Sequence, residues 1–320
     1  MKNRIVFGPI PSRRVGKSLG INNIPPKICS YSCIYCQIGE TYLLSKERKE
    51  FYKIEEIQTQ VLKKISELRK RKEEINFLSF VSDGEPTLDI NLGKEIELLK
   101  EIKIPIAVFT NSSLINLKDV QEDLLKANWI SIKIDTVDEK IWKKINRPHP
   151  DLNLKEILEG ILEFSDKYKG SLNTETMLVE GINTNKEQIE ETADFISKIK
   201  REKVYISVPT RPPAVKTIKI PKKEIIKTAY DIFLKKNLNP ELLTGFSEHG
   251  FPKISNVQEE ILNITSVHPL KEEDVQKILK KANKDWSLVE NLIKEGEIRM
   301  VKFRKNKFFL RNLKKEIKNG

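Results

Sequence analysis

The chain has 320 residues, 38% of them hydrophobic, which is more than one small core requires and predicts one large domain with a smaller appendage. Its 58 Lys and Arg residues outnumber its 46 Asp and Glu residues, and the net charge of +12 favours an anionic partner. The sequence has no apolar leader and no stretch of about 18 apolar residues, so we expect a cytoplasmic protein that neither enters a membrane nor is secreted.

The positive charge is concentrated at the two ends of the chain. Residues 1–27 hold six basic side chains and no acidic one, and residues 299–320 hold nine basic and one acidic. These ends could contact a polyanion, although charged runs more often form a solvated surface.

The opening segment, residues 7–24, is rich in glycine and proline and then becomes extended. Pro9 and Pro11 exclude a helix there. Arg13 and Arg14 could pair with a carboxylate or phosphate of a substrate, although such a pair is also common as a surface feature.

All three cysteines, Cys29, Cys33 and Cys36, lie in one short stretch of the chain. This spacing suits a [4Fe–4S] cluster that keeps one iron without a protein ligand. A structural zinc site is the alternative, but it normally needs four protein ligands and no fourth cysteine exists. The odd number of cysteines also argues against a disulfide framework.

The cysteine spacing, with the aromatic Tyr35 before the last cysteine, resembles the radical S-adenosylmethionine (SAM) superfamily. The resemblance implies that the open iron binds SAM and that one-electron reduction releases a 5′-deoxyadenosyl radical, which abstracts hydrogen from a substrate. It also implies an electron donor such as ferredoxin or flavodoxin. The opening segment resembles the branch around tRNA wybutosine synthase, but this chain lacks thiols for the second cluster of the archaeal enzymes, so their specific reaction does not transfer.

After the cysteines, short apolar runs alternate with amphipathic segments, which predicts parallel strands joined by helices. With the strand before the cysteines there are six units, which favours an α/β fold, a partial (β/α)6 TIM-like barrel over residues 1–252. Predicted strands cover residues 75–81, 104–109, 129–134, 172–179 and 204–208, and predicted helices cover 54–74, 91–100, 117–127, 139–145, 154–168 and 186–200.

Polar residues follow several of these strands, at the barrel edge that carries chemistry in complete barrels. Gly84 and Glu85, in the sequence Asp83-Gly84-Glu85-Pro86, resemble the glycine-glycine-glutamate motif that binds the amino group of SAM, with Asp83 replacing the first glycine. The resemblance also implies cofactor contacts at three more positions: Asn111, Asp135 and Gly181. A loop Asp or Asn is otherwise most often a helix cap.

Three further residues could contact a substrate. Arg147 and Arg211 lie in proline-rich loops near the predicted mouth, where a rigid arginine suits an anionic group. A salt bridge to a helix is the alternative for both. His249 could act as an acid or base, but a lone histidine beside glycine is more often structural.

Residues 253–320 change in character and predict a separate winged-helix-like module. Helices are expected over 257–264, 271–281 and 285–294, with Asp285 as a cap, followed by a basic hairpin with Asn306 in its turn. The third helix carries Glu290 and Glu295 and no arginine, so we do not expect sequence-specific DNA binding.

Three functions remain open. The two basic ends and the resemblance favour a single-cluster radical SAM enzyme that modifies an RNA, such as tRNA. The first alternative is an enzyme that modifies or activates a protein docked on the winged helix. The second is an iron–sulfur regulator without catalytic activity, which the acidic third helix disfavours.

Overall fold

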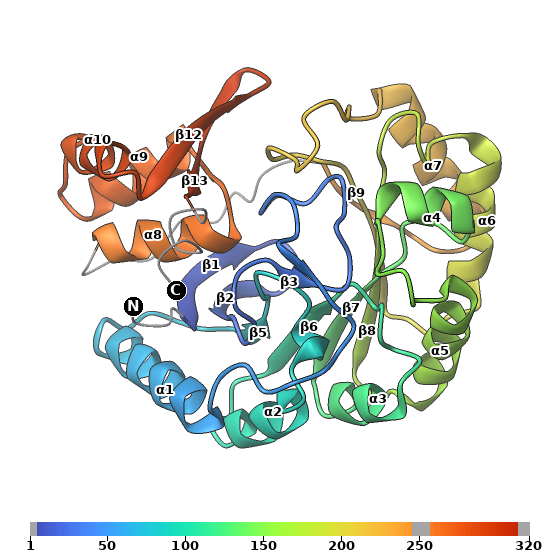
Figure 1. Ribbon diagram of the computed structural model, residues 1–320, viewed down its shortest axis with the longest axis horizontal. Helices are drawn as coiled ribbons and strands as arrows, with labels where there is room; N and C mark the ends of the chain where they lie inside the picture. Colours follow the sequence, from blue (N-terminus) through green and yellow to red (C-terminus); the bar gives the residue numbers. More distant parts are fainter. Residues whose placement is uncertain (1–4, 245–256, 313–320) are drawn as a thin grey trace.

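The computed structural model describes residues 5–244 and 257–312, and its main feature is an eight-stranded sheet. The strands lie in the order β1, β2, β5, β6, β7, β8, β9, β10. All neighbours are parallel except β1, which is antiparallel to β2. The sheet curls into a half-barrel with helices on its outer side (Figure 1). The predicted α/β half-barrel is therefore confirmed.

Helices and strands of the half-barrel alternate along the chain. The strands of the sheet are Val6–Ser12 (β1), Gly16–Ile21 (β2), Phe77–Phe80 (β5), Ile106–Thr110 (β6), Trp129–Lys133 (β7), Ser171–Met177 (β8), Lys203–Ser207 (β9) and Glu241–Leu243 (β10). The helices are Ile54–Lys70 (α1), Pro86–Leu88 (η1, a 3-10 turn), Leu92–Lys100 (α2), Lys118–Leu124 (α3), Glu139–Ile145 (α4), Leu154–Lys167 (α5), Lys186–Ser197 (α6) and Lys223–Lys235 (α7).

Apolar periodicity explains how the helical layer attaches to the sheet. In α1, Ile57, Val61, Ile65 and Leu68 recur at helical spacing and are all buried. They belong to the same core as Leu78 and the other apolar residues of the sheet. Burying a side chain of this size stabilises the fold by roughly 1.5–3 kcal/mol, so the layer is held mainly by its apolar contacts.

The inner face of the half-barrel has a separate apolar cluster. Val15, at the tip of the β1–β2 hairpin, packs with Trp129, Tyr205 and Leu243. The tip of this hairpin therefore lies against β7, β9 and β10, and it brings Arg14 to the inside of the half-barrel.

The prediction of six strand–helix units omitted some elements of the half-barrel. Strand β1 is an additional edge strand, where the missing N–H groups of Pro9 and Pro11 are tolerated. Strand β10 is only three residues long and forms the other edge of the sheet. Helix α7 was also missed, although its buried residues Ala229, Ile232 and Phe233 have helical spacing.

The C-terminal residues 257–312 form a second, smaller core. They comprise Val257–Val267 (α8), Leu270–Lys271 (β11), Glu272–Lys281 (α9), Ser287–Lys294 (α10), Ile298–Phe303 (β12) and Asn306–Arg311 (β13), with the strands in the order β11, β13, β12. Helix α8 lies against β1 (Figure 1). The buried Glu260 accepts hydrogen bonds from the Gly8 amide (2.9 Å) and from Lys64 (2.7 Å), which ties α8 to the half-barrel.

Two local predictions in this part were wrong. Phe303 pairs with Asn306, so the hairpin turn is formed by Arg304 and Lys305, and Asn306 belongs to β13. Arg304 supplies the positive φ of 56° that the tight turn requires. Helix α10 begins at Ser287 with Trp286 in the N-cap position, so Asp285 is not the cap; it precedes the helix and accepts a hydrogen bond from the Ser287 amide (3.0 Å).

Candidate functional site

Backbone hydrogen bonds connect the cysteine loop to the C-terminal end of α4. The amide of Ser32 donates to the carbonyl of Asn146 and the amide of Ile34 to that of Ile145, both at 3.0 Å. The His149 amide in turn donates to the Ser30 carbonyl at 2.9 Å. The last carbonyls of a helix have no hydrogen-bond partner within the helix, so they can accept hydrogen bonds from the amides of this loop.

The three cysteines fit the cluster that the sequence predicts. All are free thiols at an intermediate exposure. Within the described residues, no three Cys, His, Asp or Glu side chains are placed to hold one metal ion. Three cysteine thiolates are the donor set of a [4Fe–4S] cluster with one open iron, whereas a structural zinc site normally needs four protein ligands.

Gly84 is required by the strand that carries Cys29. A Cβ atom at Gly84 would lie 1.6 Å from the carbonyl oxygen of Ile28, in β3 (Ile28–Cys29). The neighbouring Glu85 amide donates to the same oxygen at 3.3 Å. On this side the glycine makes room for the cysteine strand, and its contact with SAM stays a prediction.

Glu85 joins the ends of two strands. Its carboxylate accepts hydrogen bonds from Thr87 (N at 3.1 Å, Oγ1 at 2.7 Å), from Thr110 Oγ1 (2.6 Å) and from the Asn111 amide (2.7 Å). Burial raises the pKa of Glu85, and these hydrogen bonds offset only part of that effect. The side chain thus fixes the loop after β5 to the loop after β6.

Asp83, which replaces a glycine of the family motif, is engaged with the strand before the cysteines. Its amide donates to Asn22 Oδ1 (2.9 Å), and its carboxylate accepts from Asn22 Nδ2 (3.0 Å). Its carbonyl accepts from the Lys27 amide at 2.9 Å. Asp83 therefore positions the entry to the cysteine loop.

Asp135 and Tyr35 form a buried pair at the end of β7. Asp135 accepts hydrogen bonds from the Tyr35 hydroxyl, from Asn146 Nδ2 (2.8 Å) and from the Met177 amide (2.9 Å). Burial raises the pKa of both groups, and the Asp135 charge raises that of Tyr35 further. Both carboxylate oxygens of Asp135 thus have protein partners.

Two carboxamides contact cysteine sulfurs. Nδ2 of Asn111 lies 3.5 Å from Cys29 Sγ and 3.0 Å from Ser30 Oγ. Nδ2 of Asn146 lies 3.4 Å from Cys33 Sγ. Asn111 was predicted as a cofactor contact, but Asn146 was missed because it follows a helix rather than a strand.

Charged side chains cross the inside of the half-barrel. Glu175 of β8 pairs with Arg14 and with Lys133 (3.3 Å) and accepts from Ser207 Oγ (2.9 Å). Burial alone would raise the pKa of Glu175, but the two cations lower it to about 2. The Nζ of Lys133 lies 5.0 Å from the centre of the Tyr35 ring, which connects this network to the cysteine loop.

Arg211 connects the cysteine loop with the C-terminal core. It donates to Gln37 Oε1 (3.4 Å), directly after Cys36, and to His268 Nε2 (2.6 Å) at the end of α8. Burial lowers the pKa of Arg211 to about 10 and holds that of His268 well below its ordinary value. His268 therefore accepts this hydrogen bond as a neutral ring.

The other predicted positions are more peripheral. Arg147 contributes its carbonyl to the Ser32 amide (3.0 Å), and Arg13 is exposed at the hairpin tip. Gly181 has a φ of 70° in a turn where its amide donates to Thr184 Oγ1, and no atom lies within 4 Å of its Cβ position. His249 lies outside the described residues.

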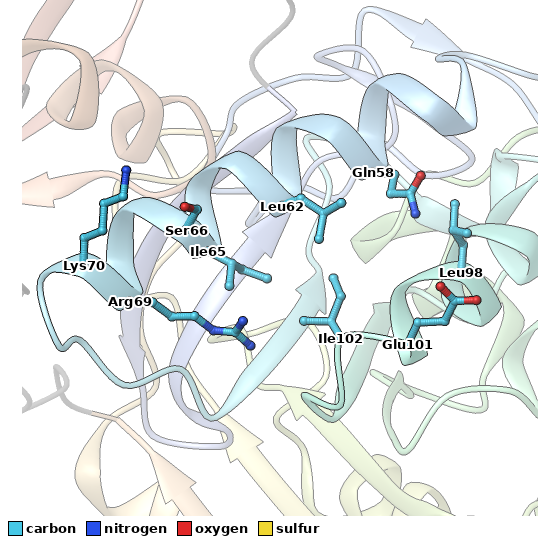
Figure 2. Close-up of a pocket in the computed structure, with 9 residues that line it drawn as sticks. All are labelled: Gln58, Leu62, Ile65, Ser66, Arg69, Lys70, Leu98, Glu101 and Ile102. Atoms are coloured by element: carbon cyan, nitrogen blue, oxygen red, sulfur yellow. The ribbon is translucent and has the colours of Figure 1, made fainter.

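A surface groove of about 700 Å³ lies between α1 and α2, on the outer side of the half-barrel (Figure 2). Its lining includes Leu62, Arg69 and Ile102, and no residue of the cysteine loop. We therefore assign it no part in the chemistry. No helix in residues 5–244 or 257–312 is long and apolar enough to cross a membrane.

Comparison with known proteins agrees with this geometry. Residues 23–196 match the model of the radical SAM superfamily. The UPF0026 protein of Methanocaldococcus jannaschii is 48% identical over 318 residues, which cover 98% of each chain. The UPF0026 protein of Helicobacter pylori (strain J99) is 31% identical over 281 residues, 86% of this chain and 88% of that protein.

A solved structure shares the fold. A radical SAM methyltransferase from Sphaerobacter thermophilus superposes with a TM-score of 0.54 at 15% identity and covers 71% of this chain and 66% of its own. The superfamily uses a [4Fe–4S] cluster and SAM, for which the cysteine spacing is suited. The chain belongs to the radical SAM superfamily and is an enzyme of that class.

Proposed function

We propose that this enzyme modifies RNA, with tRNA as the first substrate to test. In this proposal Cys29, Cys33 and Cys36 hold the cluster, and SAM binds beside Tyr35, Glu85 and the other predicted cofactor positions. When bound, the cofactors supply a carbon radical that removes hydrogen from the substrate. A ferredoxin or flavodoxin supplies the electron.

The observation that supports the proposal is the set of exposed basic side chains on the β12–β13 hairpin, one of which acts electrostatically on the start of the cysteine loop. The pKa of Lys27 is lowered first by burial and also by the positive charge of Arg299 on β12. Lys27 precedes Cys29 by only two residues. The charge of Arg299, at the start of β12, therefore reaches Lys27, and we propose that the basic hairpin faces the cluster site.

The basic side chains of the hairpin are available for an external anion. Arg299, Lys302, Arg304 and Lys305 are exposed and form no salt bridge with any carboxylate in the described part of the chain. Lys307 differs, because it pairs with Glu272 at 2.8 Å. Unpaired cations along a projecting ribbon suit a phosphate backbone, which binds largely through such charges.

We also propose that residues 253–320 form a winged-helix-like module and residues 1–252 the barrel. Three helices followed by a two-stranded ribbon, with a separate core, support this division. Because α10 presents Glu290 and no arginine, the module is suited to backbone contact rather than to reading DNA bases.

The test is 5′-deoxyadenosine formation by the anaerobically reconstituted, dithionite-reduced enzyme. We expect total tRNA to raise the rate and tRNA digested with ribonuclease to have no effect. A rise with total soluble protein and none with RNA would reject the proposal in favour of a protein substrate.

A further inference from the structure

Two carboxamides, those of Asn111 and Asn146, lie against cysteine sulfurs. Asn111 follows β6 and Asn146 follows α4, so they approach the loop from different elements. Nδ2 of Asn111 lies 3.5 Å from Cys29 Sγ, and Nδ2 of Asn146 lies 3.4 Å from Cys33 Sγ. Both distances are normal for an N–H donor and a sulfur acceptor.

Asn146 is held in place by groups other than the sulfur. Its Nδ2 donates to Asp135 Oδ2 (2.8 Å) and lies 3.2 Å from the Tyr35 hydroxyl oxygen. Asn146 is itself buried, and its backbone carbonyl accepts from the Ser32 amide. The carboxamide therefore has little freedom to turn away from Cys33.

The position of Asn146 separates two negative groups. One N–H can point to the Asp135 carboxylate while the other points to the sulfur of Cys33. The hydrogen bond from Asn146 to Cys33 Sγ places a donor on the sulfur beside the negatively charged Asp135 carboxylate. Asn146 thus favours negative charge on this sulfur.

We propose that Asn111 and Asn146 are positioning residues that raise the reduction potential of the [4Fe–4S] cluster. Reduction adds one electron, and part of its charge resides on the sulfurs. Hydrogen bonds to cluster sulfurs stabilise the reduced form and are one of the factors that set its potential. This inference rests on the proposed cluster ligands and is independent of the substrate.

The test is a redox titration of the reconstituted cluster without SAM, followed by the electron paramagnetic resonance signal of the reduced form. We expect Asn111→Ala and Asn146→Ala each to shift the midpoint potential to more negative values, and the double variant to shift it further. Asn146→Asp replaces the N–H donors by a carboxylate acceptor, so it should shift the midpoint potential further in the negative direction than Asn146→Ala does.

Asn183→Ala is the matched control. Its Nδ2 donates to the carbonyls of Asp135 and Met177, both at 2.8 Å, and has no sulfur contact. The midpoint potential of the cluster in Asn183→Ala should equal that of the wild type. Wild-type potentials in both alanine variants, at equal iron and sulfide content, would overturn the inference. If Asn146→Ala does not assemble the cluster, the test rests on Asn111→Ala alone, and a wild-type midpoint potential in that variant would overturn the inference.

Discussion

The cysteine loop and the β12–β13 hairpin differ in how their polar groups are used. Around the cysteine loop, Glu85 and Asp135 each accept several hydrogen bonds from other parts of the half-barrel. On the β12–β13 hairpin, Arg299 and Lys302 point to solvent. Groups that are already bonded hold a fixed geometry, whereas unpaired cations can adapt to a flexible polyanion. The comparison therefore separates a rigid cofactor site from an adaptable surface for the substrate.

The largest effect is expected from Cys33→Ala. Removing one of three thiolates leaves too few protein ligands for the cluster, so the visible absorbance after anaerobic reconstitution should be almost completely lost. Iron and sulfide analysis checks the loss. An unchanged spectrum would show that the ligands are wrongly assigned and that the region around them is not the cofactor site.

Gly84→Ala tests the rigidity of the site. The new methyl group would collide with the Ile28 carbonyl, which is backbone and cannot rotate away. We expect destabilisation of about 3 kcal/mol in chemical denaturation, together with impaired cluster assembly.

The control for this substitution is Gly296→Ala. Its φ of 70° carries the usual strain of about 1–2 kcal/mol, but no atom lies within 4 Å of the new methyl group. Equal losses in the two variants would mean that backbone conformation, rather than contact with the cysteine strand, explains the effect.

Glu260→Ala tests whether the two regions are joined as the structure indicates. The change leaves the buried Gly8 amide and Lys64 without this partner, and we expect a loss of about 1–3 kcal/mol. Denaturation in urea measures it. Glu290→Ala, at an exposed position on α10, should change the stability by less than about 0.5 kcal/mol. A Glu260→Ala loss no larger than this would contradict the contact.

The last effect concerns pH. Burial raises the pKa of Glu95, and the neighbouring Asp89 raises it further. The folded protein therefore retains a proton that the unfolded chain releases, so stability should fall as pH rises from about 5 towards 9. Glu95→Gln should flatten this decline in urea titrations at several pH values, whereas Glu122→Gln, at an exposed position, should not. A decline as steep in Glu95→Gln as in the wild type would exclude Glu95 as one of its sources.

The sequence predicted the elements with strong periodicity and the residues within one contiguous motif. Helix α1 and the cysteine spacing are examples, because neighbouring positions alone define them. It did not predict the partners of those residues. Asn146 reaches Cys33 across 113 positions, and Arg211 reaches His268 across 57, and neither pairing leaves a local pattern. Strand β10 was missed because three residues are too few to show alternation.

The most direct test of the whole account compares two variants, each lacking four positive charges, in the 5′-deoxyadenosine assay. The hairpin variant has glutamine in place of four basic residues of the hairpin: Arg299, Lys302, Arg304 and Lys305. The control variant has glutamine in place of four lysines on the outer helices: Lys155, Lys186, Lys223 and Lys227. The account predicts that the hairpin variant loses RNA stimulation by about tenfold or more and keeps its rate without RNA. Equal RNA stimulation in both variants would contradict it.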